Sequence, residues 1–315
     1  MRRLLQTNTS LFTCQGQPNE TKPTRELATL IPSIAAADGA GVKLRRSLGS
    51  GLDQRHDPFL MLDEFFSDDP DDYIAGFPSH PHRGFETITY MLDGHMRHED
   101  SHGNRGDLGP GDAQWMTAAS GIIHSEMPQQ AAGRLRGFQL WLNLPAAEKM
   151  LPASYRDIAA HEIPEVLIPG IGAIRIIAGE LRRGDETTTG PIAGVTTQPI
   201  FFDLRLESHA QISTPVPFTH NALLYVYEGE ATVGEAGRPL LFRSAGLLSE
   251  GETVKLQAGK DGARVLLLAG LPLREPIVQY GPFVMNTREQ IDQAITDYRN
   301  GDLGRRPAVA AASRI

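Results

Sequence analysis

Short apolar runs separated by turn residues recur about every ten residues from Thr29 onward, and this spacing constrains the fold more than any other feature. The runs include FETITYML (85–92), GFQLWLNL (137–144) and ALLYVYEGEATV (222–233), and Gly, Pro, Asn and Asp gather between them. Each run has the length of a strand, and the residues between runs favour tight reversals of the chain. Such regularly spaced short strands are typical of an all-β sandwich or barrel.

The chain has 315 residues, which is long for one small barrel and sufficient for two domains of ordinary size. A weak internal repeat agrees with two copies of one barrel. The hexamer TYMLDG (89–94) resembles LYVYEG (224–229), and each is a strand that ends in an acidic residue and a glycine. We therefore expect two antiparallel β-barrels.

The strand pattern is interrupted between Leu144 and Asp157, where Pro145 and Pro152 occur, and we place the connection between the domains there. The start of the chain is polar and aperiodic, and it is expected to be a flexible leader. The predicted segments are 1–25 for the leader, 26–150 for the first barrel, 151–285 for the second barrel, and 286–315 for a helix and a tail.

One segment near the end of the chain has helical periodicity. Asn286 is a typical N-cap residue with Glu289 three positions later, and Gly301 stands where a helix would stop. We expect this helix to pack across the junction of the two domains and to bury its apolar stripe. The stripe consists of Ile291, Ala294, Ile295 and Tyr298.

Composition argues against several classes of protein. The formal net charge is −8 and there is no basic block, so neither nucleic-acid binding nor attraction to an anionic membrane is indicated. The best apolar stretch, 265–273, is interrupted by glycine and is too short to cross a membrane. Cys14 is the single cysteine, which excludes an intrachain disulfide and a thiolate metal cluster and fits a reducing compartment. We expect a soluble, cytoplasmic monomer in which Cys14 is a neutral surface thiol.

The spacing of four residues suggests a metal site. His80 and His82 are two positions apart, and so are His124 and Glu126, so each pair points to one face of a strand. Two strands facing each other across a barrel could deliver three imidazoles and one carboxylate to one interior point, leaving two octahedral positions open for catalysis. With ten histidines, however, a His-x-His pair arises by chance roughly a third of the time. Spacing alone leaves both interpretations open.

The remaining histidines carry weaker signals. His95, His98 and His102 lie in the polar stretch HMRHEDSHGN, which we interpret as a solvated hairpin. His209 and His220 in the second domain have no partner at strand spacing, so no metal site is expected there.

Several long motifs resemble the pirin family, whose members have two domains of the cupin, or jelly-roll, type. The resemblance extends from about Leu48 to Leu303. It implies that Glu126 is the fourth metal ligand and that Glu86, the ligand in many other cupins, either orients a histidine or takes the ligand position instead. It also implies a second domain without metal. The motifs are HPHRGFETITYMLDG, HEDSHGN, LGPGDAQWMTAASGIIHSEMP, GFQLWLNLP and GPFVMNTREQIDQAI.

The same resemblance implies a function. Three nitrogen ligands and one oxygen suit Fe(II), Ni(II), Mn(II), Cu(II) or Zn(II), and the family association makes Fe(II) the first choice. Some pirins are similar to quercetin 2,3-dioxygenases, which implies cleavage of a planar aromatic flavonol by O₂. We expect Glu126, or Glu86 instead, to accept the substrate proton at the metal. Trp115, Trp141 and Phe85 could line the substrate cavity or simply pack in the core. The rival hypotheses are a metal- or redox-dependent regulatory protein that binds a protein partner, and a barrel with only a structural role.

Overall fold

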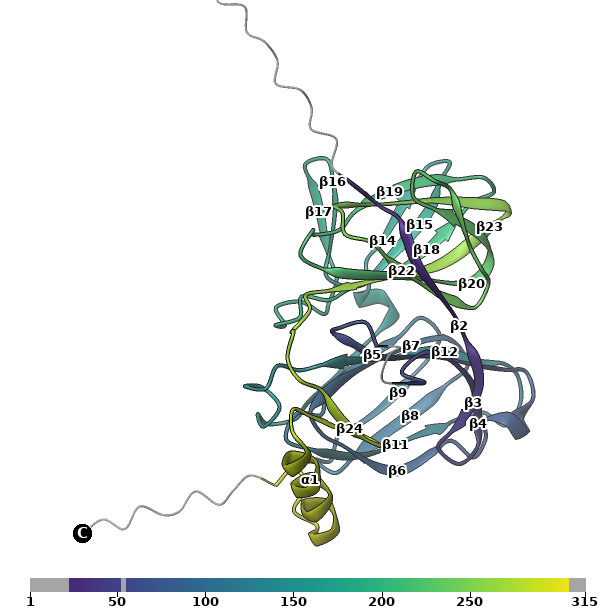
Figure 1. Cartoon of the computed structure of the whole chain (residues 1–315). Coiled ribbons are helices and arrows are strands. Elements are labelled where there is room, and N and C mark those ends of the chain that lie inside the picture. Colours follow the sequence, from purple (N-terminus) through teal and green to yellow (C-terminus); the bar gives the residue numbers. More distant parts are fainter. Residues whose placement is uncertain (1–22, 52–54, 306–315) are drawn as a thin grey trace, which may run out of the picture.

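The structure, a computed structural model, describes residues 23–51 and 55–305. They form two β-rich domains stacked on one another, with a single helix at the far end of the first domain (Figure 1). Cys14, nearly all of the predicted leader and most of the predicted tail lie outside the described residues.

The first domain consists of a seven-stranded and a four-stranded sheet. Its strands are β3 (Ile34–Asp38), β4 (Val42–Leu48), β5 (Phe59–Ser67), β6 (Phe77–His82), β7 (Phe85–Asp93), β8 (Met96–Asp100), β9 (Arg105–Leu108), β10 (Ala113–Thr117), β11 (Ile122–Pro128), β12 (Leu135–Asn143) and β13 (Ser154–Ile158), with a short 3-10 helix, η2 (Pro70–Asp72). The larger sheet has the order β13-β10-β7-β12-β5-β4-β3 and the smaller one the order β6-β11-β8-β9.

The second domain is built on one ten-stranded sheet. Its strands are β1 (Thr24–Arg25), β2 (Leu27–Pro32), β14 (Glu165–Ile168), β15 (Gly172–Ala178), β18 (Ile200–Leu206), β19 (Gln211–Pro215), β20 (Asn221–Val233), β21 (Arg238–Leu240), β22 (Ser244–Leu248) and β23 (Thr253–Gly270). The main path is β14-β15-β18-β23-β20-β22-β2, and β23 also pairs with β1 and β19. Smaller elements are η3 (Ala160–Glu162) and the two-stranded pairs β16 (Glu180–Arg183) with β17 (Glu186–Thr189) and β24 (Val278–Tyr280) with β25 (Phe283–Met285).

The predicted all-β architecture with one helix is confirmed, but the predicted closed barrels are not. Among residues 23–51 and 55–305 the strand pairs form open sheets, and β1 pairs with β23 in parallel. In the second domain, residues 263–269 of the long strand β23 pair with β18, and residues 253–257 pair with β19.

The two domains exchange strands at their boundaries. At the start of the chain β2 pairs with β22 of the second domain, and β3 then pairs with β4 of the first. After the proline-containing stretch, β13 returns to pair with β10 of the first domain before the chain enters the second. The predicted boundaries at 26 and 150 therefore do not coincide with the division between the sheets. Each exchanged strand pairs with the free backbone N–H and C=O groups of an edge strand in the other domain. This pairing joins residues that are far apart in the sequence, so local sequence patterns do not predict it.

The larger sheet of the first domain is buried on both faces. On β7, Ile88 and Tyr90 belong to an apolar cluster that includes Tyr225 of the second domain. Thr89 points to the opposite face, where its hydroxyl lies 3.4 Å from Oε1 of Glu126 on β11. Since side chains alternate along a strand, one face of this sheet forms the interdomain core and the other faces the smaller sheet.

The single helix, α1 (Arg288–Asn300), begins one residue later than predicted. Thr287 is its N-cap and Gln290 completes the capping box, in place of the predicted Asn286 and Glu289. The Asn286 amide instead donates to a carbonyl of the preceding loop. Gly301 ends the helix in the left-handed conformation, with φ 75°, as predicted.

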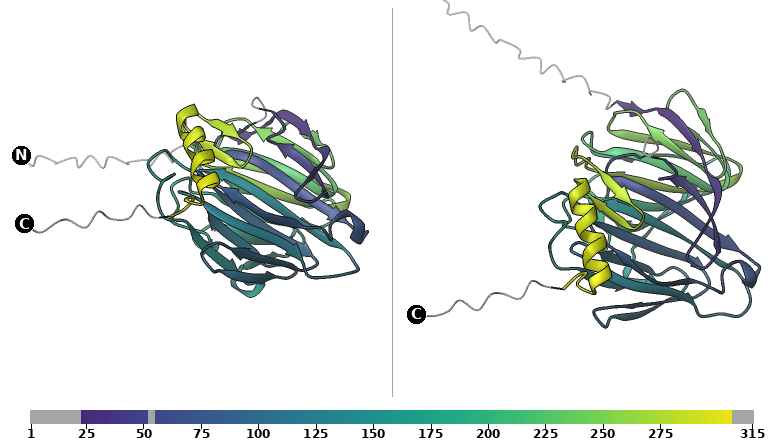
Figure 2. Two further views of the ribbon diagram at one scale, coloured as in Figure 1. Left: turned by 90° about the horizontal axis from the view of Figure 1, so that it is seen from below. Right: turned by 60° about the horizontal axis from the view of Figure 1, so that its bottom comes forward.

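The helix packs against the first domain and not at the domain junction. The C-terminal segment runs down the side of the first domain to β24 and α1, which lies near β11 and β6 (Figures 1 and 2). Ile291 is fully buried with Phe283, beside Ile123 of β11, and Ile295 is partly buried. Tyr298 is 40% exposed, so its predicted burial is wrong. Within the described part of the chain, no helix is long and apolar enough to span a membrane.

Candidate metal centre

β6 and β11 are antiparallel neighbours in the smaller sheet and carry the three predicted histidine ligands. His80 lies directly opposite His124 in the pairing of these strands. His82 follows two residues later on β6 and points to the same face as His80. The imidazoles therefore come from adjacent strands of one sheet, not from strands that face each other across a barrel.

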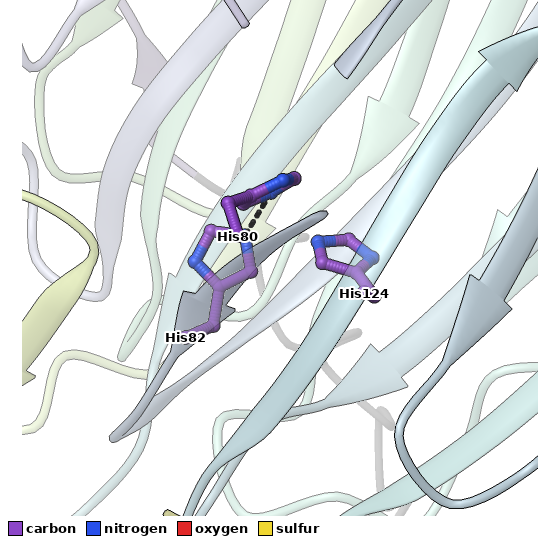
Figure 3. A group of neighbouring side chains, drawn as sticks. All are labelled: His80, His82 and His124. Carbon is purple, nitrogen blue, oxygen red and sulfur yellow. Dashed lines mark hydrogen bonds between the residues drawn. The ribbon is translucent and has the colours of Figure 1, made fainter. Parts of the chain in front are cut away.

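The three rings converge on one point (Figure 3). The Nε2 atoms of His80 and His82 are 3.0 Å apart. The His124 ring centroid lies 4.3 Å from that of His80 and 4.9 Å from that of His82. Each ring offers one nitrogen within 4.8 Å of the nitrogens of the other two, which is close enough for one ion to contact all three.

The hydrogen bonds of these rings leave nitrogens available for a metal ion. His80 donates from Nδ1 to the Pro78 carbonyl oxygen, 2.8 Å away, so its Nε2 carries a lone pair, and this lone pair faces Nε2 of His82 at hydrogen-bond distance, 3.0 Å (Figure 3). The Nε2 atom of His124 is buried and has no hydrogen-bond partner among the described residues. Buried polar atoms normally have a partner, so an orphaned imidazole nitrogen in a cluster of three fits a ligand position.

The electrostatics of the site favour neutral imidazoles. His82 and His124 are each only 2% exposed. Burial lowers the pKa of both rings well below its usual value, and the neighbouring imidazoles lower it further. The neutral ring is the form that binds metal ions, so His82 and His124 do not need to lose a proton before an ion binds.

Glu126 lies next to this group and is held by Gln139. The Gln139 amide nitrogen lies 3.2 Å from Oε1 and 3.1 Å from Oε2 of the Glu126 carboxylate. Trp141 in turn donates from Nε1 to the Gln139 oxygen at 3.0 Å. A carboxylate oxygen of Glu126 lies within 4.8 Å of nitrogens of His98 and His124, so Glu126 forms a second group that shares His124 with the first.

Glu86 points away from this site. Its Oε1 accepts hydrogen bonds from the Thr117 hydroxyl at 2.7 Å and the Trp115 indole at 3.2 Å, both on β10. It shares the face of β7 with Ile88, toward the interdomain core. Its even spacing from His82 is misleading because Gly84, at φ 90°, turns the chain between β6 and β7 and breaks the alternation. Glu86 therefore neither orients a histidine nor lies at the ligand position in this structure.

The position of Glu86 predicts a pH-dependent cost to folding. Burial raises its pKa from 4.5 to about 7, so between these pH values the folded chain keeps a proton that the unfolded chain has lost. Stability therefore falls as pH rises through this window, by about 3 kcal/mol in total. Glu86→Gln has no proton to lose, so we expect its stability not to fall in this way. Urea unfolding of the metal-free proteins should then show that the free energy of unfolding of the variant, relative to that of the wild type, is larger at pH 8 than at pH 5.5. An equal free-energy difference at both pH values would contradict this prediction.

His98 is a site residue that sequence reasoning missed. It is fully buried and its Nδ1 lies 3.2 Å from Nδ1 of His124, whereas His95 and His102 on the same hairpin are exposed as predicted. The signal was present in the sequence, because His98 and Asp100 also have the i, i+2 spacing on β8. Because the hairpin is polar, its sequence predicts a solvent-exposed His98.

The isolated histidines of the second domain lie outside both groups of potential metal ligands. His209 is exposed, and His220 is buried with Nε2 placed 3.0 Å from the Gln198 carbonyl oxygen. Among the residues that the structure describes, both groups of potential metal ligands lie in the first domain.

A cavity of about 770 Å³ opens onto the candidate metal centre. His80, His82 and Glu126 line it, together with apolar side chains that include Phe65 and Trp141. Its volume is in the range of small-molecule sites. Of the three aromatic residues considered from the sequence, only Trp141 lines the cavity. Phe85 stacks on the Trp141 ring, with 4.3 Å between the ring centroids, and Trp115 lies outside the lining.

Comparison with known proteins identifies relatives over most of the chain. The family model described as Pirin matches residues 41–142, and the one described as the Pirin C-terminal cupin domain matches residues 201–304. A protein of Pseudomonas aeruginosa with the name "Putative quercetin 2,3-dioxygenase" is 54% identical over 89% of this chain and 98% of its own length.

Solved structures have the same fold. A crystal structure of quercetin 2,3-dioxygenase from Acinetobacter baumannii superposes with a TM-score of 0.80 at 34% identity, covering 90% of this chain and 99% of that one. A bacterial pirin from Escherichia coli in complex with nickel(II) has a TM-score of 0.59 at 20% identity, covering 78% of this chain and 98% of that one.

Proposed function

Because the chain belongs to the pirin family, we propose that it is a metal-dependent dioxygenase that cleaves a flavonol such as quercetin with O₂. The observation that carries the proposal is the convergence of His80, His82 and His124 beside a cavity large enough for a planar aromatic molecule. Similarity to proteins named as quercetin 2,3-dioxygenases supports this choice of substrate.

We assign the ion to His80, His82 and His124, with Glu126 as the carboxylate ligand. Fe(II) is the first choice, and Ni(II), Mn(II), Cu(II) and Zn(II) suit the same donors. When bound, such an ion supplies Lewis-acid and redox chemistry for a substrate oxygen and O₂. The E. coli pirin, which was solved with nickel(II), makes Ni(II) a reasonable probe for metal binding.

The protein's own residues bind the substrate and accept its proton. Glu126 borders the cavity, and its carboxylate can take the proton of a flavonol hydroxyl at the site. Gln139 and Trp141 hold this carboxylate in place through successive hydrogen bonds. Trp141 and Phe65 line the cavity and offer apolar surfaces against which an aromatic ring can lie.

The proposal predicts flavonol cleavage with release of carbon monoxide. The chain loaded with Fe(II) and supplied with quercetin and O₂ should consume the flavonol and release one CO for each O₂ taken up. Glu126→Gln keeps the size of the side chain but removes the base, and we expect it to lower the rate by about 10²- to 10⁴-fold. The measurement is flavonol absorbance together with O₂ uptake and CO release.

A matched control separates this effect from a change in surface charge. Glu99 lies on the neighbouring strand β8 and is exposed, so Glu99→Gln should cleave quercetin at the wild-type rate. A wild-type rate in Glu126→Gln would refute the assigned base. Tight metal binding without turnover of any flavonol would favour the regulatory alternative, in which the metal site tunes binding of a protein partner. Cytoplasmic location and the monomeric state remain predictions.

A further inference from the structure

We propose that His98 and Asp100 are a positioning pair that holds His124 in the tautomer able to bind the metal ion through Nε2. The proposal rests on the metal centre assigned above. It adds a role for two residues on β8 that contribute no ligand atom to the group formed by His80, His82 and His124.

β8 and β11 are neighbours, and their register brings the pair to His124. His124 lies directly opposite Asp100, and His98 is opposite Glu126. The side chains of His98, Asp100 and His124 are all buried. Nδ1 of His124 is at hydrogen-bond distance, 3.2 Å, from Nδ1 of His98. Nε2 of His98 lies 3.6 Å from Oδ2 of Asp100, within ion-pair reach but without a hydrogen bond.

The direction of the hydrogen bond between the two histidines decides which nitrogen of His124 is free. One of the two Nδ1 atoms must donate and the other must accept. If His124 donates, its Nε2 has a lone pair that faces the ligand cluster. If His98 donates, neutral His124 must carry its proton on Nε2 and cannot bind an ion there.

Asp100 selects the first of these arrangements. Its carboxylate faces Nε2 of His98, where a proton is favoured and a lone pair is repelled. With a proton on Nε2, neutral His98 has its lone pair on Nδ1 and accepts from His124. A carboxylate behind an imidazole is a recurrent way to set the tautomer and basicity of a metal-binding histidine, here acting through one additional ring.

Asp100 itself is held as an acceptor. Its Oδ1 accepts from the backbone N–H groups of His102 and Asn104 at 2.8 and 3.0 Å. Its Oδ2 accepts from the Asn104 side chain at 2.8 Å. The turn of the hairpin therefore orients both carboxylate oxygens, and it fixes the negative charge that lies 3.6 Å from Nε2 of His98.

The plane of the His98 ring is also constrained. Tyr155 of β13 stacks on it, with 4.5 Å between ring centroids and 25° between planes. The Tyr155 hydroxyl is anchored by Asp157 and Gln114. A β-carbon at Gly106, the partner of His98 on β9, would come within 2.2 Å of this hydroxyl. The exchanged strand β13 thus contributes to the shape of the site.

The tautomers can be read directly in the metal-free full chain. Long-range ¹H–¹⁵N spectra of the imidazoles distinguish protonation at Nδ1 from protonation at Nε2, with signals assigned from His98→Phe and His124→Ala. We expect His124 to be protonated at Nδ1 and His98 at Nε2. In Asp100→Asn one carboxylate oxygen becomes an amide NH₂ group, which donates and can no longer accept. Nε2 of His98 then faces a donor, so the His98 proton should shift to Nδ1 and the His124 proton to Nε2. A His124 protonated at Nε2 in the wild type would overturn the proposal.

Metal affinity gives a second readout. His98→Phe keeps a ring stacked on Tyr155 but cannot accept from His124, and we expect its Ni(II) affinity to fall by about 10- to 100-fold. His95→Phe makes the same change at an exposed position of the same hairpin and should bind Ni(II) like the wild type. Thermal unfolding of the metal-free variants shows whether each is folded.

The outcomes distinguish this inference from the metal centre on which it rests. If the wild type does not bind Ni(II), the metal centre is wrong. If the wild type binds Ni(II) and folded His98→Phe and Asp100→Asn bind it equally well, the metal centre stands and the positioning pair is refuted.

Discussion

Replacing His124 by alanine is expected to abolish both metal binding and flavonol cleavage. His124 belongs to both groups of potential ligands, and its Nε2 is buried without a hydrogen-bond partner among the described residues. Loss of a residue that only hydrogen-bonds to a metal ligand weakens metal binding by roughly 10- to 100-fold. Loss of His124, a direct ligand, should weaken Ni(II) binding by more than that. The measurement is Ni(II) titration of the metal-free protein, followed by quercetin turnover after loading with Fe(II).

His95→Ala is the control, since His95 is exposed and contributes to neither group. It should match the wild type in Ni(II) affinity and turnover. Unchanged Ni(II) binding in a folded His124→Ala variant would show that the ion is held elsewhere, and the dioxygenase mechanism built on this cluster would have to be abandoned.

Replacing Lys149 by methionine is expected to destabilise the fold by about 3 kcal/mol, because buried acceptors lose their donor. The Lys149 ammonium is fully buried and donates to Gly84 O and Asn143 Oδ1 at 2.6 Å and to Val284 O at 3.1 Å. Methionine has a similar length but leaves these buried oxygens without a donor. Urea unfolding of the metal-free protein should show a lower midpoint for Lys149→Met.

Lys43→Met is the matched control for this substitution. Lys43 is exposed and forms a surface ion pair with Asp72, so its loss should leave the unfolding midpoint close to that of the wild type. If both variants unfold at the wild-type urea concentration, the buried ammonium contributes nothing to stability.

The Lys149 contacts also explain how a distant part of the chain supports the candidate metal centre. Gly84 follows the histidine strand β6 after one residue, and Val284 belongs to β25 near the C-terminus. Arg83, which comes directly after His82, pairs with Asp297 of α1 at 2.7 Å. The C-terminal segment therefore braces the end of β6 through backbone, ammonium and ion-pair contacts.

The spacing of His80, His82 and His124 was sufficient to suggest a cluster because each relation within a strand is local. Side chains that are two residues apart on an extended strand point to the same face, whatever the strand packs against. The same reasoning failed for Glu86, since the turn at Gly84 lies between it and the histidines. A β-carbon at Gly84 would come within 2.0 Å of Val284 O, a contact that depends on a residue about two hundred positions away.

By itself, the sequence determined the properties that depend on near neighbours. These are the strand-rich architecture, the capped helix before Gly301 and the paired spacing of the histidines and Glu126. The tertiary structure alone decided the contact between His98 and His124, the exchange of β2 and β13 between domains, and the placement of α1 beside β11. The physical reason is that strand partners and burial are set by contacts between residues far apart in the chain, which local periodicity does not encode.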